Sequence, residues 1–326
     1  MLCIKDLHTD PYFNLAADEY VMKNFKEDCF MLWRNEPSII VGKHQNTLAE
    51  INVDYVRENN IKVVRRISGG GAVFHDLGNL NFTFIRNSEE GAQVDFRKFT
   101  LPILEVLQKM GINAKFEGRN DLTIDGRKFS GNAEHVWKNR TLHHGTLLFS
   151  AVMTNLSDAL KVNPLKFNDK AVKSVRSRVT NISEHLQEKM EVLEFRDRIM
   201  KHIMEMYPDS KEYKYTADDI AGIEKLRDEK FMTWDWNFGF SPKYDFEKMI
   251  RTEGGSIEFH FNVEKGIIKD IRIYGDFFHK HDIEDVQKSL IGVKHEYKAI
   301  VENLSKFNFN EYFKNIKVEE IAQGMF

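Results

Sequence analysis

Strand-like and helix-like patterns follow one another in this 326-residue chain without a regular alternation. Short apolar runs at residues 30–33 and 38–41 predict a pair of strands. Asp125-Gly126, a strong turn dipeptide between two further apolar runs, predicts a hairpin. A doubly wound parallel sheet needs strict strand–helix–strand alternation. We therefore expect an α+β fold, with a mixed or antiparallel sheet and flanking helices.

The remaining elements follow from hydrophobic periodicity. Leu80, Phe82 and Phe84 alternate with polar residues and predict a half-buried strand, whereas Pro102 implies a kink or a later start in its helix. Helices are predicted at 11–21, 52–60, 95–110 and 191–207, and further strands at 61–66, 141–149, 256–263 and 267–274. The sequence pattern changes near residue 250, where a predicted hairpin begins and is followed by two or three short charged helices. We expect two domains, 1–248 and 249–326.

Composition excludes several classes of protein. A net charge of −3 gives no general attraction to nucleic acid or anionic membranes. No apolar run approaches the roughly 20 residues that cross a bilayer, and the N-terminus does not resemble a signal peptide. Only Cys3 and Cys29 are present, which fits a reducing compartment. We expect a cytoplasmic protein, and a monomer because no repeat or coiled coil is evident.

The segment Ser68-Gly69-Gly70-Gly71 follows a predicted strand that ends in Arg65-Arg66. Consecutive glycines expose backbone N–H groups, which can form an anion-binding concavity. Side chains alternate along a strand, so one arginine can face a ligand while the other faces away. The alternative is a plain loop. The segment is not a Walker A loop, a dinucleotide-binding fingerprint or a serine nucleophile elbow.

A second polar group surrounds the predicted hairpin. Asp121 could hold Mg²⁺ beside a phosphate, and Lys128 could supply a mobile charge to a phosphate or a carboxylate. Taken alone, such a lysine is most often a solvated surface group. His143 and His144 are adjacent on a predicted strand and point to opposite faces, so they cannot easily chelate one metal ion.

The stretch 163–179 lacks periodicity, which is typical of a long loop. Its cations could form a solvated surface or a lid that orders over phosphates. The basic residues in and just before it are Lys161, Lys166, Lys170, Lys173, Arg176 and Arg178.

Several of these segments together resemble a known protein family. Residues 65–79, RRISGGGAVFHDLGN, resemble the signature of lipoate–protein ligases, and segments 118–121, 128–131, 144–148 and 173–178 follow in that family's order. Residues beyond about 250 resemble the accessory domain of its longer bacterial members. The resemblance implies the fold of biotin–protein ligases, related to class II aminoacyl-tRNA synthetases. It also implies that lipoate and MgATP form lipoyl-adenylate and pyrophosphate, and that the lipoyl group then passes to a lysine of a 2-oxoacid dehydrogenase E2 or of glycine-cleavage H protein.

The resemblance assigns roles residue by residue. Lys128 would be catalytic, bridging the lipoate carboxyl group and the α-phosphate, and Asp121 would orient the metal. An apolar tunnel for the acyl chain could be lined by strands around Leu32, Val41 and Phe82. The ATP-binding residues would be Arg66, Gly71, Ala72, Val73, Phe74, Asn79, Asn120 and Lys128. The lipoate-binding residues would be Arg66, Ser68, Gly70, Gly71, His75, Lys128, His144 and Gly145.

Four alternatives remain at the level of sequence. Relatives that transfer acyl groups without ATP use an activated cysteine, but both cysteines lie before the signature and Cys29 is expected to be a buried structural thiol. A transferase would accept preformed lipoyl-adenylate and activate lipoate poorly. A non-catalytic lipoate-binding or carrier-docking protein would not need the Lys128 motif. A biotin ligase would carry its own arginine- and glycine-rich loop, which is absent here.

Overall fold

The computed structural model describes residues 1–87, 96–118, 120–160, 167–168, 179–277 and 280–326. The chain divides into two compact units. Unit 1 comprises 1–43, 58–160 and 174–233, and unit 2 comprises 44–57, 161–173 and 234–326. The basic residues between 161 and 178, which were predicted to form a solvated surface or a lid, lie outside the described residues.

Unit 1 is built on an eight-stranded sheet in the order β12-β1-β2-β6-β10-β9-β8-β7. Strand β1 is parallel to both neighbours, and the other pairs are antiparallel, so the predicted mixed sheet is confirmed. The strands are β1 (Leu2–Lys5), β2 (Cys29–Trp33), β6 (Asn79–Asn87), β7 (Ala114–Glu117), β8 (Asp121–Ile124), β9 (Arg127–Trp137), β10 (Arg140–Leu148) and β12 (Lys211–Tyr213).

A second, three-stranded sheet of unit 1 has the order β4-β3-β5. Its strands are β3 (Ser38–Val41), β4 (Lys62–Arg65) and β5 (Val73–His75). Strand β3 runs parallel to β4 and antiparallel to β5. The prediction that residues 30–33 and 38–41 pair with each other is wrong, because β2 and β3 belong to different sheets. Residues 34–37 carry the chain from one sheet to the other.

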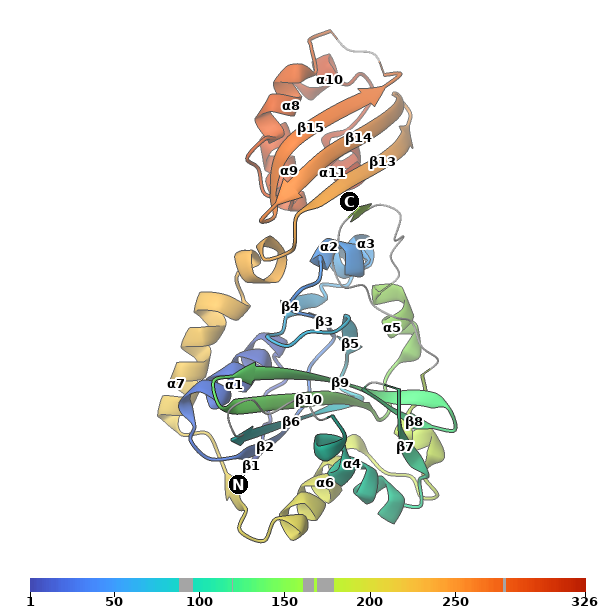
Figure 1. The fold of residues 1–326 in the computed structure, drawn as a ribbon. Helices are drawn as coiled ribbons and strands as arrows, with labels where there is room; N and C mark the ends of the chain where they lie inside the picture. The colour runs from blue at the N-terminus through green and yellow to red at the C-terminus, as the bar shows by residue number, and fades with distance from the viewer. Residues whose placement is uncertain (88–95, 119, 161–166, 169–178, 278–279) are drawn as a thin grey trace. The chain divides into compact units, whose positions relative to one another are not determined.

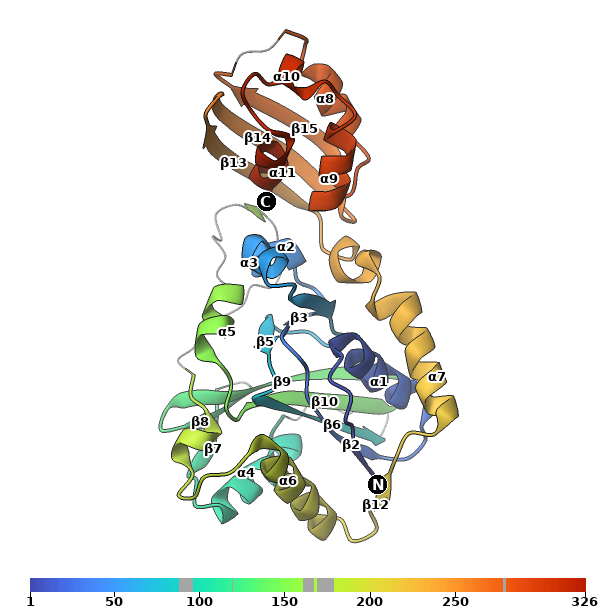
Figure 2. The ribbon, with the colours of Figure 1, turned by 180° about the vertical axis from the view of Figure 1, so that it is seen from behind.

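The helices of unit 1 lie on both faces of the large sheet (Figures 1 and 2). Helices α4 and α6 cover one face, and α1 with the three-stranded sheet lies over the other. The helices are α1 (Pro11–Asn24), α4 (Phe96–Lys109), α5 (Met153–Ala159), α6 (Val192–Met206) and α7 (Ala217–Leu226), with short helical turns at Ile182–His185 and Arg227–Phe231. Helix α4 begins at Phe96, so Pro102 lies inside the helix and does not delay its start.

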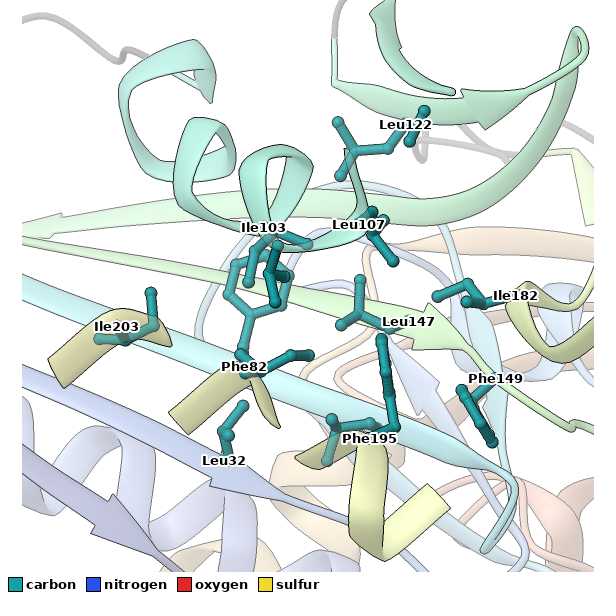
Figure 3. Close-up of a cluster of buried hydrophobic side chains, with 14 of the residues drawn as sticks. Leu32, Phe82, Ile103, Leu107, Leu122, Leu147, Phe149, Ile182, Phe195 and Ile203 are labelled. Atoms are coloured by element: carbon teal, nitrogen blue, oxygen red, sulfur yellow. The ribbon is translucent and has the colours of Figure 1, made fainter. Parts of the chain in front are cut away.

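A hydrophobic core of unit 1 lies between the large sheet and the helices α4 and α6 (Figure 3). Phe82 and Leu147 from the sheet pack there with Ile103 and Phe195 from the helices. Strand β6 is buried on both faces from Asn79 to Ile85, so the prediction of a half-buried strand is wrong. Its polar positions face the second sheet and α1 instead of solvent.

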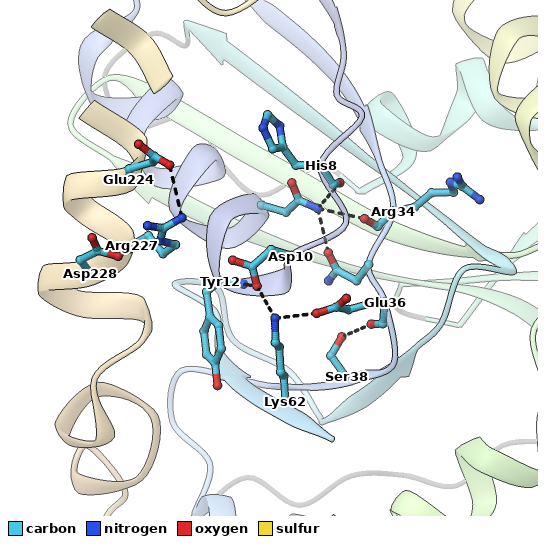
Figure 4. A network of polar contacts seen from close by, with 12 residues as sticks. His8, Asp10, Tyr12, Arg34, Glu36, Ser38, Lys62, Glu224, Arg227 and Asp228 are labelled. Carbon is cyan, nitrogen blue, oxygen red and sulfur yellow. Dashed lines mark hydrogen bonds and ion pairs between the residues drawn. The ribbon is translucent and has the colours of Figure 1, made fainter. Parts of the chain in front are cut away.

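A polar network fixes the start of α1 (Figure 4). The Asp10 carboxylate accepts from the backbone N–H of Tyr12 at 3.3 Å and therefore caps the helix. It also pairs with Lys62 Nζ at 2.9 Å, and Lys62 pairs with Glu36 as well. Strand β4, which leads into the glycine-rich segment, is thereby tied to the first turn of α1.

Unit 2 contains a four-stranded sheet in the order β11-β13-β14-β15. Its strands are β11 (Phe167–Asn168), β13 (Tyr244–Thr252), β14 (Gly255–Glu264) and β15 (Ile267–Gly275). Helices α8 (Glu284–Leu290), α9 (Tyr297–Leu304) and α11 (Val318–Gly324) cover one face, and α2 (Thr47–Glu50), α3 (Val53–Glu58), α10 (Phe309–Tyr312) and a turn at Asp235–Gly239 complete the helical elements. The predicted hairpin at 256–274 is confirmed. Strand β13 was not expected, and it crosses residue 248, where the domain division was placed. That division stays a prediction.

Candidate functional site

The glycine-rich segment follows β4, and its two arginines point in different directions, as expected for a strand. Arg65 Nη1 donates to the carbonyls of Gly42 and Lys43, each at 3.0 Å. Arg66 Nη2 donates to the carbonyls of Gly69 at 2.6 Å and Gly71 at 2.8 Å. Burial lowers the pKa of both guanidinium groups to about 10, so both stay charged near neutral pH. Arg66 therefore acts as a clamp that fixes the shape of the loop through hydrogen bonds to its backbone carbonyls.

Gly70 is the residue whose backbone most requires glycine. Its φ of +91° lies in the left-handed region that other residues rarely adopt. The backbone of the loop also approaches β3 closely, because a Cβ at Gly42 would lie 2.0 Å from the carbonyl oxygen of Gly70. The shape of the loop is thus set by one left-handed glycine, one close backbone contact and the Arg66 clamp.

A buried hydrogen-bonded chain connects this loop to α1. Asp18 accepts from His144 Nδ1 at 2.8 Å, and His144 Nε2 lies 2.6 Å from Ser68 Oγ. A carboxylate can only accept, so Nδ1 carries a proton, and in the neutral tautomer Nε2 accepts from the Ser68 hydroxyl. Ser68 in turn accepts from Arg66 Nε at 3.0 Å. The second oxygen of Asp18 accepts from Thr83 Oγ1 at 2.8 Å.

His75 lies in a second polar chain on the same face of the sheet. Its Nδ1 is 3.1 Å from Asn35 Nδ2, and its Nε2 is 2.8 Å from Thr146 Oγ1. The amide nitrogen of Asn35 is a donor, so Nδ1 accepts and Nε2 carries the hydrogen. Burial, followed by the charge of Arg66, lowers the pKa of His75 to about 3. His75 is therefore neutral and can act as a fixed hydrogen-bonding group.

Lys128 and Asp121 form an ion pair with 2.8 Å between Nζ and Oδ1. Both side chains are partly exposed, so a ligand can reach them. Gly131 leaves room for this lysine, because a Cβ there would lie 3.1 Å from Lys128 Nζ. Beside the pair, Asn120 Nδ2 donates to the carbonyl of Asn132 at 2.6 Å, which holds the Asn120 amide in place.

The other predicted site residues fall into two groups. Ala72, Val73 and Phe74 lead into and form β5, and Asn79 Nδ2 donates to the carbonyl of Phe74 at 3.2 Å. Gly145 is on β10, where a Cβ would lie 2.2 Å from Asn132 Oδ1 and 2.7 Å from the Phe82 ring. Packing on the far face of the sheet therefore accounts for this glycine, whatever its contact with a ligand.

The strands around Leu32 and Phe82, which were expected to line a tunnel, present side chains to both faces of the large sheet. Leu32 and Phe82 belong to the core against α4 and α6, on the face opposite the glycine-rich loop. Their strand neighbours Trp33 and Asn81 point toward the loop instead, since Trp33 Nε1 donates to Thr83 Oγ1 at 3.0 Å. That the strands around these residues line a tunnel stays a prediction, because alternation reveals two faces of a strand but not which one binds a ligand.

Asp18, Thr83 and Thr146 also belong to these hydrogen-bonded chains and were not predicted from the sequence. Asp18 lies in an apolar stretch of α1, and the two threonines look like ordinary strand residues. An acidic residue on the buried side of a helix was the one available signal, because such a group needs a partner. Its partner, His144, is 126 positions away and could not be inferred from local patterns.

Two other chemistries find little support in the geometry. Cys3 and Cys29 are both buried, and burial raises the pKa of Cys29 to about 12, which opposes a thiolate nucleophile. His143 bonds Glu134 at 2.8 Å on the face opposite His144. Within the described residues, no group of three or more histidine, cysteine, aspartate or glutamate side chains could hold a metal ion. No helix among them is long and apolar enough to cross a membrane.

Comparisons with known proteins identify the family of this chain. Residues 10–204 match the lipoyl protein ligase A/B catalytic domain, and residues 241–325 match the bacterial lipoate protein ligase C-terminus. The chain is 46% identical to lipoate–protein ligase 1 of Staphylococcus aureus, covering 97% of each chain. It is 44% identical to a lipoate–protein ligase of Bacillus subtilis, covering 95% of each chain.

Solved structures give the same result. A Plasmodium falciparum protein in complex with lipoate is similar over 99% of this chain and 98% of its own, with a TM-score of 0.63 and 26% identity. A lipoate–protein ligase A bound with ATP is similar over 73% of this chain and 98% of its own, with a TM-score of 0.62 and 26% identity. A bipartite ligase of Thermoplasma acidophilum, described with its E2 lipoyl domain, covers 73% of this chain and 96% of its own, with a TM-score of 0.62 and 27% identity. This chain belongs to the lipoate–protein ligase family.

Proposed function

We propose that this protein joins lipoate to a carrier protein in two steps at the site between the glycine-rich loop and Lys128. In the first step a lipoate carboxylate oxygen attacks the α-phosphorus of ATP, and pyrophosphate leaves. In the second step the ε-amine of a carrier lysine attacks the acyl carbon, and AMP leaves. The observation that carries the proposal is the position of Lys128, on the face of the large sheet that also presents His144 and Thr146, the partner of His75.

The first step brings two anions together, so charge neutralisation and alignment matter more than proton transfer. Lys128 Nζ is a mobile cation that we assign to the lipoate carboxylate and the α-phosphate. Ligand binding would replace its present ion pair with Asp121. Arg66 adds a buried positive charge behind the loop, whose exposed N–H groups we assign to the nucleotide, together with residues 71–74, Asn79 and Asn120.

Mg²⁺ fits this site. It binds through one or two carboxylates plus substrate phosphates and keeps several waters, and Asp121 provides a partly exposed carboxylate beside Lys128. Bound there, Mg²⁺ would neutralise phosphate charge. Asp121 would then have two tasks in turn, holding Lys128 before substrate arrives and orienting the metal afterwards.

We assign the acyl chain to the face of the large sheet that carries Trp33 and His144, beneath His75 of β5, with Ser68, Gly70 and Gly71 closing over it. The second step needs no enzyme nucleophile, because the adenylate is a good leaving group. The carrier would be a lipoyl domain of a 2-oxoacid dehydrogenase E2 or the glycine-cleavage H protein. We propose that the protein acts as a monomer in the cytoplasm, which its two free cysteines fit.

Pyrophosphate release tests this proposal. With lipoate and MgATP, we expect lipoate-dependent release without any carrier, and transfer of the lipoyl group when a carrier domain is added. No release, together with transfer from supplied lipoyl-adenylate, would show an adenylate-dependent transferase instead.

Lys128→Ala tests the catalytic lysine. We expect a 100- to 1000-fold loss of release, on the order of the effect of removing one preorganised charge-stabilising group. Lys115→Ala is the matched control, because Lys115 is exposed on β7 and has no role in the site. Near-normal release by a folded Lys128→Ala protein would refute the role of Lys128.

A further inference from the structure

Asn81 is a buried amide on β6 whose hydrogen-bonding groups are unused. The residue is 1% exposed. Neither its Oδ1 nor its Nδ2 has a hydrogen-bond partner among the described residues. An unpaired buried polar group costs the full desolvation of that group, so such positions call for an explanation. Both atoms of one amide are affected here, which makes Asn81 a strong candidate for a ligand contact.

The register of the large sheet gives the direction of this side chain. Asn81 pairs with Trp33 on β2 and with Thr146 on β10. Directly paired residues of antiparallel strands point to the same face. Thr146 bonds His75, and the Trp33 ring lies edge-on to the His75 ring with 6.1 Å between the centroids. The Asn81 amide therefore points to the face beneath His75, where we have placed the acyl chain.

Trp33, Asn81 and Thr146 form a row of directly paired residues across neighbouring strands, and this row continues to the catalytic lysine. Thr146 pairs with Gly131 on β9, and Gly131 pairs with Asp121 on β8. Lys128 Nζ lies above Gly131 and bonds Asp121. A straight row across neighbouring strands thus runs from the lysine, over Gly131 and Thr146, to Asn81.

The length of this row matches an eight-carbon acid. Asn81 is two strands from Gly131, which is roughly 9.5 Å at the usual spacing between strands. An extended chain advances roughly 1.3 Å per carbon–carbon bond, so carbon 6 lies about 6 Å and carbon 8 about 9 Å from the carboxyl carbon. With its carboxylate on Lys128, lipoate would place carbons 6 to 8, which carry its two sulfur atoms, between Thr146 and Asn81.

We infer that Asn81 is a specificity-determining residue that favours lipoate over octanoate. The two acids have the same chain length, but lipoate offers sulfur, a weak acceptor, where octanoate offers only methylene groups. Asn81 Nδ2 can donate to a dithiolane sulfur. Octanoate would cover the amide without giving it a partner. The inference rests on the proposed function, because it takes Lys128 as the anchor of the carboxylate.

The test compares lipoate and octanoate with the full chain, by carrier-free pyrophosphate release and by calorimetric binding. We expect Asn81→Leu, a change of similar volume, to lower the lipoate-to-octanoate ratio of kcat/KM and of affinity by roughly 3- to 10-fold. The variant should fold at least as stably as the natural chain, because it removes an unpaired buried amide. Asn81→Met provides a second reading if leucine does not fit.

Asn181→Leu is the matched control. Asn181 is a buried amide whose two groups both bond the backbone of Ala151, at 2.9 and 3.0 Å. Its replacement should lower stability and leave the substrate ratio unchanged. The inference is overturned if Asn81→Leu behaves in the same way, or if the natural chain binds both acids equally.

Failure of the proposed function gives a different result. A chain that binds lipoate but releases no pyrophosphate is not a ligase, yet the binding ratio of Asn81→Leu still decides the role of Asn81. A natural chain that binds neither acid would refute both proposals.

Discussion

Asp18 illustrates how single residues control this site from a distance. Its carboxylate accepts from His144 and Thr83, and so directs His144 Nε2 to accept from Ser68 and leaves Ser68 to accept from Arg66. Each member fixes the orientation of the next, which is how outer residues align a binding group. The glycine-rich loop is thereby coupled to α1, although neither element's sequence indicates the other.

Asp18→Asn should break this chain at one point. An asparagine amide can accept from only one of the two present donors, so either His144 or Thr83 loses its acceptor. We expect the free energy of unfolding to fall by about 1–3 kcal/mol, and lipoate-dependent pyrophosphate release to fall on the order of tenfold because the loop is held less firmly. Thr83→Ser keeps both hydroxyl bonds and serves as the control. A less stable Asp18→Asn protein with undiminished release would show that the chain only supports the fold.

Single residues also show where sequence reasoning stops. Arg66, Ser68, His75 and His144 were predicted at the site, and their hydrogen bonds bring them to one face of the sheet. The alternation that predicted two faces could not decide between Leu32 and Trp33, because both faces of these strands are buried. Only long-range pairing distinguishes the core face from the face beneath the loop.

At the scale of elements, the loop after β4 depends on backbone geometry more than on side chains. Gly70→Ala forces a side chain into the left-handed region and places its Cβ 2.9 Å from Arg66 Nη2. We expect a loss of about 1–2 kcal/mol in stability from the backbone alone, together with weaker ATP binding. Gly69→Ala is an internal control, because a Cβ there meets nothing within 4 Å. Equal melting temperatures for the two variants would contradict this account.

Individual elements were predicted better than their partners. The hairpin of β8 and β9 was found because its turn is encoded locally, and Asp125 and Gly126 have positive φ angles of 50° and 71°. The pairing of β2 with β6, across about fifty residues, has no such local signal. Strand neighbours in a mixed sheet are decided by burial in the assembled core.

At the scale of the whole molecule, the chain does not divide at one point. Residues 44–57 lie in unit 2, although they connect strands of unit 1. Thr47 Oγ1 donates to the carbonyl of Asn237 at 2.6 Å, and Gln323 Nε2 donates to Asp54 at 3.1 Å. A change in sequence pattern near residue 250 cannot reveal that residues 44–57, far upstream, belong to the same unit.

His295 makes the stability of unit 2 depend on pH. It is 1% exposed, and its ring stacks on Phe326 with 4.5 Å between the centroids. Nε2 donates to the carbonyl of Met325 at 2.6 Å, and Nδ1 accepts from the hydroxyl of Tyr244. Burial lowers the pKa of His295 from 6.5 to about 4. The unfolded chain therefore binds the proton first as the pH falls, and the folded ring must stay neutral to keep the bond from Tyr244.

It follows that the contribution of His295 is complete above pH 6.5 and is lost as the pH falls from 6.5 toward 4. Between pH 7 and pH 5 this loss amounts to about 2 kcal/mol. Urea unfolding of the full chain at both pH values measures the total change, to which His75 contributes with the same sign because its pKa is also lowered. His295→Phe should be less stable at pH 7, because Tyr244 and Met325 lose a partner, but its stability should depend less on pH. An unchanged pH dependence in this variant would show that protonation of His295 does not limit the acid stability of the fold.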